Sequence, residues 1–190
     1  FPLEAIIAKL DSRPAIVVIV SPNNPTGGVA SLDDVRRIAA AAPESLLLVD
    51  QAYIEYGDED IGPAVLELPN VVVVRTMSKA WGLAGCRVGY AVGSSEVIAV
   101  LRATGAPYPV AGPSLALALA QLRRGDAAIR AHVTQVRAER ASLGQLLRAR
   151  GVDARVSQAN FVFGDFGARM GFVRAGVGAR AVLVGGFPGR

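Results

Sequence analysis

The sequence predicts an α/β fold: a three-layer sandwich with a mostly parallel central sheet, followed by part of a smaller α+β C-terminal unit. Short apolar runs alternate with segments of helical spacing, as expected when helices connect parallel strands. The runs are continuous rather than alternating, which is typical of strands covered on both faces. These runs are Ala15–Val20, Leu46–Val49, Val71–Val74 and Val88–Val92. The composition can fill such a core, because 52% of the 190 residues are apolar and 19% are charged.

The connections between these strands carry signals of their own. A loop rich in Pro, Asn and Gly occupies Ser21–Gly28. A helix is expected from Ser31 through Ala42, because Ser31 and Asp34 have the spacing of a capping box. Its predicted inward face consists of Leu32, Val35, Ile38 and Ala39.

Polar clusters follow three of the four predicted strands. The clusters are Asn23-Asn24, Asp50 to Tyr53, and Arg75 to Lys79. In open α/β sheets, ligands bind beyond the carboxyl ends of the strands. We therefore expect the three clusters to share one crevice.

A change of composition marks the second part of the chain. Three prolines between Ala106 and Pro113 predict a linker. Beyond it the spacing predicts helices at Ser114–Arg123, at Asp126–Arg150 and from about Gly167, and strands at Val152–Val156, Phe161–Phe163 and Ala181–Val184. The predicted organisation is thus a partial large domain over residues 1–106, and a linker with a truncated small domain over residues 107–190.

The charge of the chain does not indicate a nucleic-acid partner, although the net charge is +4 and the pI is near 9.7. Many arginines between Arg123 and Arg155 are interleaved with acidic residues and have few aromatic neighbours. Helical spacing predicts that Arg130, Arg137, Arg140 and Arg148 lie on the solvent face of the long helix, with Ile129, Val133, Val136, Leu143 and Leu147 facing inward. A solvated helix face is therefore the preferred interpretation.

Rare residues narrow the chemistry further. A single cysteine, Cys86, excludes an internal disulfide, and a single histidine, His132, excludes a His-rich zinc site, so no metal is expected. Low cysteine usage favours a reducing cytoplasm. No apolar run reaches the roughly 18 residues of a membrane helix, and the opening residues do not resemble a secretory signal. The chain also begins without Met, as an excerpt from a longer protein would.

Lysine is scarce, and one of the two lysines, Lys79, lies among polar residues. An amine that attacks a carbonyl must be held in position and have its pKa lowered. Beside it, Thr76, Ser78 and Arg87 can hold a phosphate dianion.

Three further residues complete the set. Asp50 can hold a proton on a heteroaromatic nitrogen, while Asn24 and Tyr53 can hydrogen-bond a phenolate oxygen. Pyridoxal 5′-phosphate presents an aldehyde, a phosphate, a pyridine nitrogen and a phenolate together. The residues thus predict this cofactor.

The motifs also resemble those of a known family. SPNNPTG (Ser21–Gly27), VDQAYIEYG (Val49–Gly57) and RTMSKAWGLAGCRVGY (Arg75–Tyr90) resemble the signature of fold-type I, class II aminotransferases. Together with GAPYPVAGPS (Gly105–Ser114) and SQANFVF (Ser157–Phe163), they are most similar to the histidinol-phosphate aminotransferases.

The resemblance implies a role for each site residue. Lys79 bonds the cofactor aldehyde and then moves the substrate proton. Asp50 pairs with the protonated ring nitrogen, and Tyr53 with Asn24 binds the ring oxygen. Ala52 packs on one ring face. The cofactor phosphate is held by Arg87 and Ser78, with Thr76. Of these residues, Lys79, Asp50 and Tyr53 are the predicted catalytic ones.

The resemblance further implies a homodimer that exchanges the amino group of L-histidinol phosphate with 2-oxoglutarate in histidine biosynthesis. Its partners would be a small-molecule amino donor and a 2-oxo acid, with no membrane partner. Relative to the family, the chain lacks the N-terminal third and the C-terminal arginine segment, and Gly185 stands where an arginine often helps to hold the substrate phosphate. Alternatives are an aromatic amino-acid aminotransferase, a threonine-phosphate decarboxylase, and a cofactor-binding chain without turnover.

Overall fold

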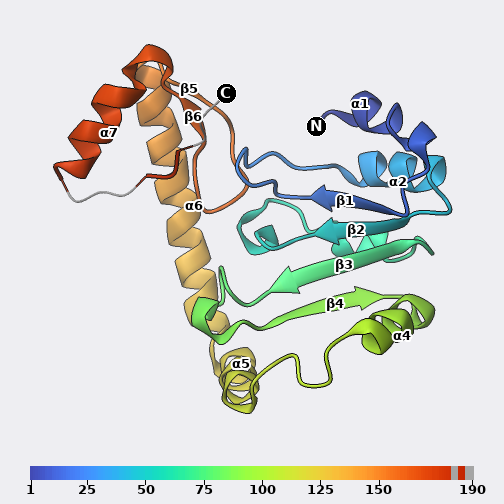
Figure 1. Cartoon of the computed structure of the whole chain (residues 1–190). Coiled ribbons are helices and arrows are strands. Elements are labelled where there is room, and N and C mark those ends of the chain that lie inside the picture. Colours follow the sequence, from blue (N-terminus) through green and yellow to red (C-terminus); the bar gives the residue numbers. More distant parts are fainter. Residues whose placement is uncertain (181–183, 187–190) are drawn as a thin grey trace.

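A four-stranded mixed sheet forms the centre of the computed structural model, which describes residues 1–180 and 184–186 (Figure 1). The strands lie in the order β1 (Ile16–Val20), β2 (Leu46–Asp50), β3 (Val71–Thr76) and β4 (Gly89–Gly93). The first three strands are parallel and β4 is antiparallel to β3. The four strands predicted for the first part of the chain are therefore all present, in a mostly parallel arrangement.

Helices cover one face of this sheet. The core there joins α1 (Leu3–Ile7), α2 (Leu32–Ala41) and α3 (Gly62–Val65) to the strands. Its buried residues include Ile19, Val35, Ile38, Leu47, Val49, Val71 and Val73. The predicted capping box is present, because Ser31 accepts a hydrogen bond from the Asp34 amide and Asp34 accepts one from the Ser31 amide.

The opposite face of β1 is open to solvent in this chain. Ile16 is 56% exposed and Val18 is 59% exposed, whereas Ile19, on the covered face, is 3% exposed. The expectation that every strand is covered on both faces is therefore wrong for β1, and also for β4, where Tyr90 is 48% and Val92 is 40% exposed. For β1 the physical reason is that α1, α2 and α3 pack on one face of the sheet only, the face of Ile19.

The remaining helices follow the sheet along the chain. Helix α4 (Ser95–Thr104) contacts β4, and α5 (Gly112–Arg124) leads into the long helix α6 (Asp126–Ala149). Three short 3₁₀ helices, η1 (Leu10–Ser12), η2 (Ile54–Tyr56) and η3 (Ala84–Cys86), lie in the loops of the first part. Helix α6 crosses the side of the sheet where the carboxyl ends of β1, β2 and β3 lie (Figure 1).

The C-terminal part is built from short elements. A two-stranded antiparallel sheet joins β5 (Asp153–Ala154) to β6 (Gly164–Asp165), and η4 (Gly167–Arg169) leads into α7 (Met170–Gly178). The strand expected at Phe161–Phe163 is wrong, since β6 begins only after it. The strand expected at Ala181–Val184 falls mostly on residues 181–183, outside the described residues. The boundary between residues 1–106 and 107–190 stays a prediction.

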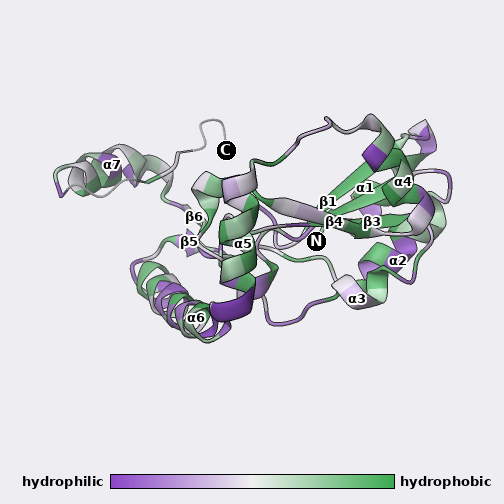
Figure 2. Ribbon diagram, turned by 90° about the horizontal axis from the view of Figure 1, so that it is seen from below, coloured by the Kyte–Doolittle hydropathy of each residue, from purple (hydrophilic) through white to green (hydrophobic). Residues whose placement is uncertain are grey.

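The spacing predicted that the arginines of α6 lie on its solvent face, but two of them contact other parts of the chain. Arg137 donates to the Gly57 carbonyl and forms an ion pair with Asp58, and Arg140 donates to the Tyr56 and Ala159 carbonyls. Leu143, expected to face inward, is 47% exposed. The hydrophobic and hydrophilic stripes of α6 are visible in Figure 2. No helix among the described residues is long and apolar enough to span a membrane.

Candidate active site

Three predicted site residues meet beyond the ends of β1, β2 and β3. Asn24 Nδ2 lies 3.0 Å from Tyr53 Oη and donates a hydrogen bond to it. The Lys79 ammonium nitrogen lies 5.2 Å from the centroid of the Tyr53 ring. Tyr53 is buried, so its ring is held in place by packing, and the lysine lies against its face. The loop after β1, the loop after β2 and the loop after β3 each contribute one residue.

Asp50 is the last residue of β2 and lies in the middle of the sheet's carboxyl edge. Its register partners are Val20 in β1 and Val74 in β3. Its Oδ1 accepts a 2.9 Å hydrogen bond from the amide of Ala52, so the carboxylate also shapes the turn that leads to Tyr53. Ala52 is half-buried and packs against the hydrophobic cluster of Tyr53 and Ala80.

Hydroxyl and guanidinium groups gather at the end of β3. Thr76 Oγ1 lies 2.9 Å from Ser78 Oγ and also accepts a hydrogen bond from the Ser78 amide. Arg87 Nη1 lies 3.5 Å from Ser78 Oγ and 3.2 Å from the Ala84 carbonyl oxygen. The Arg87 backbone has a φ of 53°, in the left-handed region. That turn brings the guanidinium back toward the serine.

The charged groups of this site have no oppositely charged partner in the part of the chain that the structure describes. Among residues 1–180 and 184–186, Asp50, Lys79 and Arg87 take part in no ion pair, and Arg87 donates only to uncharged oxygens. A ligand that carries an anionic group, a protonated nitrogen and an electrophilic carbon would satisfy all three. Pyridoxal phosphate has these groups, so the residues present fit it. The same described part of the chain holds no group of three His, Cys, Asp or Glu side chains arranged for a metal ion.

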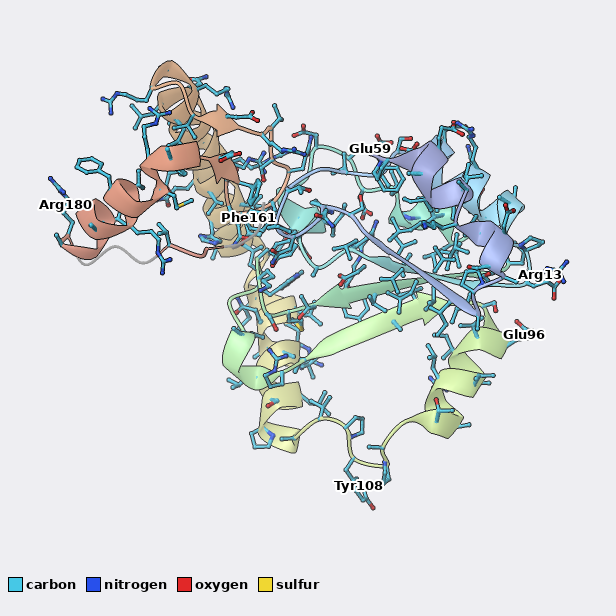
Figure 3. All side chains as sticks on the ribbon, turned by 45° about the horizontal axis from the view of Figure 1, so that its top comes forward. Arg13, Glu59, Glu96, Tyr108, Phe161 and Arg180 are labelled. Carbon is cyan, nitrogen blue, oxygen red and sulfur yellow. The ribbon has the colours of Figure 1, made fainter. Side chains whose placement is uncertain are left out.

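A segment far along the chain closes one side of the site. Phe161, labelled in Figure 3, lies on the loop between β5 and β6 and packs edge-on against Tyr53, with the ring centroids 5.3 Å apart. The backbone N–H of Gln158 donates a hydrogen bond to the Gly27 carbonyl oxygen at 2.8 Å. The sequence motif SQANFVF contained Phe161, but no local spacing indicated that it would contact Tyr53. Tyr108, in the linker, is 92% exposed and points away from the site (Figure 3).

Comparison with known proteins places the chain in a family. The model of the family "Aminotransferase class I and II" matches residues 2–173. An aromatic amino acid aminotransferase of Mycobacterium bovis is 40% identical over 189 residues, which cover 96% of this chain and 53% of that protein. The chain thus spans about half the length of the curated relatives it matches.

Solved structures match along nearly the whole chain. A putative histidinol-phosphate aminotransferase from Erwinia carotovora atroseptica has a TM-score of 0.87 at 29% identity, and covers 100% of this chain and 57% of its own. The histidinol-phosphate aminotransferase from Sinorhizobium meliloti, solved with pyridoxal-5′-phosphate, has a TM-score of 0.84 at 26% identity, over 98% of this chain and 54% of its own. From the fold, the family match and the 40% identity, the chain belongs to the class I and II aminotransferases.

Proposed function

We propose that this chain carries the cofactor site of a pyridoxal-phosphate-dependent aminotransferase. The observation that carries the proposal is a set of three charges, Asp50, Lys79 and Arg87, that lie at one edge of the sheet and form no ion pair within the described part of the chain. Unpaired charges in a protein cost free energy unless a ligand or solvent satisfies them. Their chemistry matches the groups of this cofactor one for one.

Each residue has a task that follows from its chemistry. Arg87, Ser78 and Thr76 bind the phosphate, because a guanidinium and two hydroxyls donate to its oxygens. Asp50 holds the proton on the ring nitrogen, and Ala52 leaves room for the ring beside it. The Tyr53 hydroxyl, which accepts from Asn24, is left with its own proton to donate to the ring oxygen.

Lys79 is the residue of the reaction itself. With the cofactor bound, the Lys79 amine would hold it at the aldehyde carbon, and once freed by the substrate amine it would take the proton from the substrate Cα and pass it to that former aldehyde carbon. When bound, the cofactor supplies an electron sink for the negative charge that develops at Cα. The face of the Tyr53 ring, 5.2 Å from Nζ, limits the directions in which the amine can move.

For the substrate, we propose an amino donor with a planar ring, with a 2-oxo acid such as 2-oxoglutarate as the acceptor. The 40% identity to an aromatic amino acid aminotransferase supports an aromatic amino acid. The motif resemblance and the two structural neighbours support histidinol phosphate, and with it a place in histidine biosynthesis. A homodimer in the cytoplasm, and the assignment of residues 1–106 and 107–190 to two domains, belong to the same proposal. The decarboxylase and the chain without turnover remain the alternatives that the assays must separate.

The cofactor assignment is tested by trapping the bond to lysine. Pyridoxal phosphate is added, the complex is reduced with borohydride, and the modified peptide is identified by mass spectrometry. Because Lys9 and Lys79 are the only lysines, the matched variants Lys9→Arg and Lys79→Arg form a complete control pair. We expect the label on Lys79 in wild type and in Lys9→Arg, and none in Lys79→Arg. Equal labelling of both lysines would contradict the assignment.

The substrate is tested with a panel of donors on the intact protein. Phenylalanine, tyrosine, histidinol phosphate and threonine phosphate are each supplied with 2-oxoglutarate, and glutamate formation and carbon dioxide release are followed. Preference for phenylalanine or tyrosine would assign aromatic amino acid aminotransferase activity. Preference for histidinol phosphate would assign histidinol-phosphate aminotransferase activity. Release of carbon dioxide without glutamate would identify a decarboxylase, and no product from any donor would identify a chain that binds without turnover.

A further inference from the structure

A hydrogen bond between Glu55 and Trp81 joins the two loops that carry Tyr53 and Lys79. Glu55 lies on η2, two residues after Tyr53, and Trp81 lies two residues after Lys79. Trp81 Nε1 donates to Glu55 Oε1 at 3.0 Å. The bond therefore connects the loop that carries the Tyr53 ring to the loop that carries the Lys79 amine.

Trp81 is fixed on its other sides as well. Its carbonyl oxygen accepts a hydrogen bond from Gln121 Nε2 on α5 at 3.4 Å. Its indole packs against the cluster that contains Tyr53 and Ala80. A tryptophan held by packing and by one directed N–H bond has little freedom to turn, so it passes the constraint along two residues of backbone to Lys79.

Glu55 is an unusual residue to hold the other end. Its second oxygen, Oε2, is buried and has no hydrogen-bond partner among the described residues. The Glu55 side chain forms no ion pair among the described residues. Its carboxyl interacts electrostatically with Arg75 and Asp60, and burial together with this carboxyl raises the pKa of Tyr56. Burial raises the pKa of the Glu55 carboxyl, partly offset by hydrogen bonds, the Trp81 N–H among them, and by Arg75. A half-satisfied buried carboxyl destabilises a fold, so stability alone does not explain it.

We propose that Glu55 is a positioning residue, whose bond to Trp81 holds Lys79 against Tyr53 in the orientation that reacts with the cofactor. The inference rests on the proposed function, because it concerns the reactivity of Lys79. Glu55 itself touches neither Tyr53 Oη nor Lys79 Nζ. Its effect reaches the amine only through Trp81.

The test separates the hydrogen bond from packing by conservative variants in the intact protein. Glu55→Met keeps the shape of the side chain and removes the acceptor, while Glu55→Gln keeps an acceptor oxygen. Trp81→Phe removes the indole N–H donor and makes the ring smaller, but keeps an aromatic side chain. Glu59→Gln, at an exposed position of the same loop, is the matched control. The measurements are the rate at which pyridoxal phosphate becomes reducible on Lys79, its affinity, and kcat with KM for the preferred donor. Circular dichroism and thermal unfolding check that each variant is folded.

We expect Glu55→Met and Trp81→Phe each to slow the bonding of Lys79 and to lower kcat by about tenfold or more, because misplacing a reacting group is costly. Cofactor affinity and KM should change by less than about threefold, since the phosphate and ring contacts come from other residues. Glu55→Gln and Glu59→Gln should stay near wild type. The double variant Glu55→Met/Trp81→Phe should be no slower than either single one, because both remove the same bond.

Other results would overturn the inference. Unchanged rates in Glu55→Met and Trp81→Phe would show that the bond does not position Lys79. Additive losses in the double variant, or loss of thermal stability with unchanged rates, would show two independent structural roles. If one variant fails to fold, the other, compared with Glu55→Gln, still decides. Failure of wild type to label at Lys79 would instead refute the proposed function, so the two failures are distinguishable.

Discussion

The contact between Gly27 and Ser157 allows a perturbation whose cost can be worked out from the structure. Gly27 has a φ of +74°, and a Cβ placed on it would overlap Ser157, 2.5 Å from its Cβ and 2.7 Å from its backbone Cα. A left-handed conformation costs a residue with a Cβ about 1 to 2 kcal/mol. Overpacking a tight contact costs about 1 to 3 kcal/mol more. We therefore expect Gly27→Ala to lower the free energy of unfolding by about 2 to 5 kcal/mol.

Urea denaturation followed by circular dichroism measures this cost. A loss of that size should move the midpoint of unfolding down by about 1 to 2 M urea. The next residue is the control: a Cβ on Gly28 meets only Thr26 Oγ1, at 3.6 Å, and its φ is not in the left-handed region. Gly28→Ala should therefore stay within about 0.5 kcal/mol of wild type.

A second variant locates the source of the cost. Ser157→Gly removes the side-chain atoms that the new Cβ would meet but leaves the Ser157 Cα, which is itself closer than real contacts allow. Combined with Gly27→Ala, it should restore only part of the lost stability. If Gly27→Ala is as stable as Gly28→Ala, the close approach of the two loops is wrong, and so is the reasoning that places Phe161 beside Tyr53.

Further predictions concern the charged residues. Asp50→Asn should lower kcat about a hundredfold with a much smaller change in pyridoxal-phosphate affinity, because an amide cannot stabilise the charge on the ring nitrogen; equal losses in both would make Asp50 structural. Arg87→Gly should weaken cofactor binding about tenfold, yet not lower the Tm, because glycine adopts a φ of 53° without strain; a lower Tm together with unchanged binding would contradict this. The hydrogen bond from Gln158, with Arg137, lowers the pKa of Asp58, so its stabilisation is present at neutral pH and is lost as the pH falls through that lowered pKa. The Tm difference between wild type and Asp58→Asn should therefore shrink as the pH falls below the ordinary aspartate pKa of about 3.9, and a difference that stays constant as the pH falls would refute the linkage.

Local signals predicted the parts of the structure that local physics determines. The capping box at Ser31 and Asp34 marked where α2 begins, because its hydrogen bonds form between neighbours in the chain. The continuous apolar runs located all four strands of the sheet. Asn24, Tyr53 and Lys79 were expected in one crevice because parallel strands end at one edge, and the structure places them together.

Contacts between distant segments could not be found in the same way. The packing of Phe161 on Tyr53 depends on how the chain returns after α6, which no local pattern encodes. Arg137 and Arg140 have the spacing of a solvent face, but the loop at Tyr56–Asp58 covers them and supplies carbonyl acceptors. Trp81 is a residue type that usually packs in a protein core, and only the fold reveals its hydrogen bond to Glu55.

We expect strand β1 to make this chain prone to self-association at high concentration. Its five residues, Ile16–Val20, include no charge, proline or glycine, and in the described part of the chain no strand pairs with its outer edge. Free amide and carbonyl groups along such an edge are a template for another strand, and the exposed Ile16 and Val18 add an apolar surface to it. A lysine at position 18 would place a charge in any strand-to-strand contact of this kind without disturbing the covered face. Val18→Lys should therefore keep preparations of this chain monodisperse in light scattering at concentrations where wild type forms thioflavin-positive assemblies.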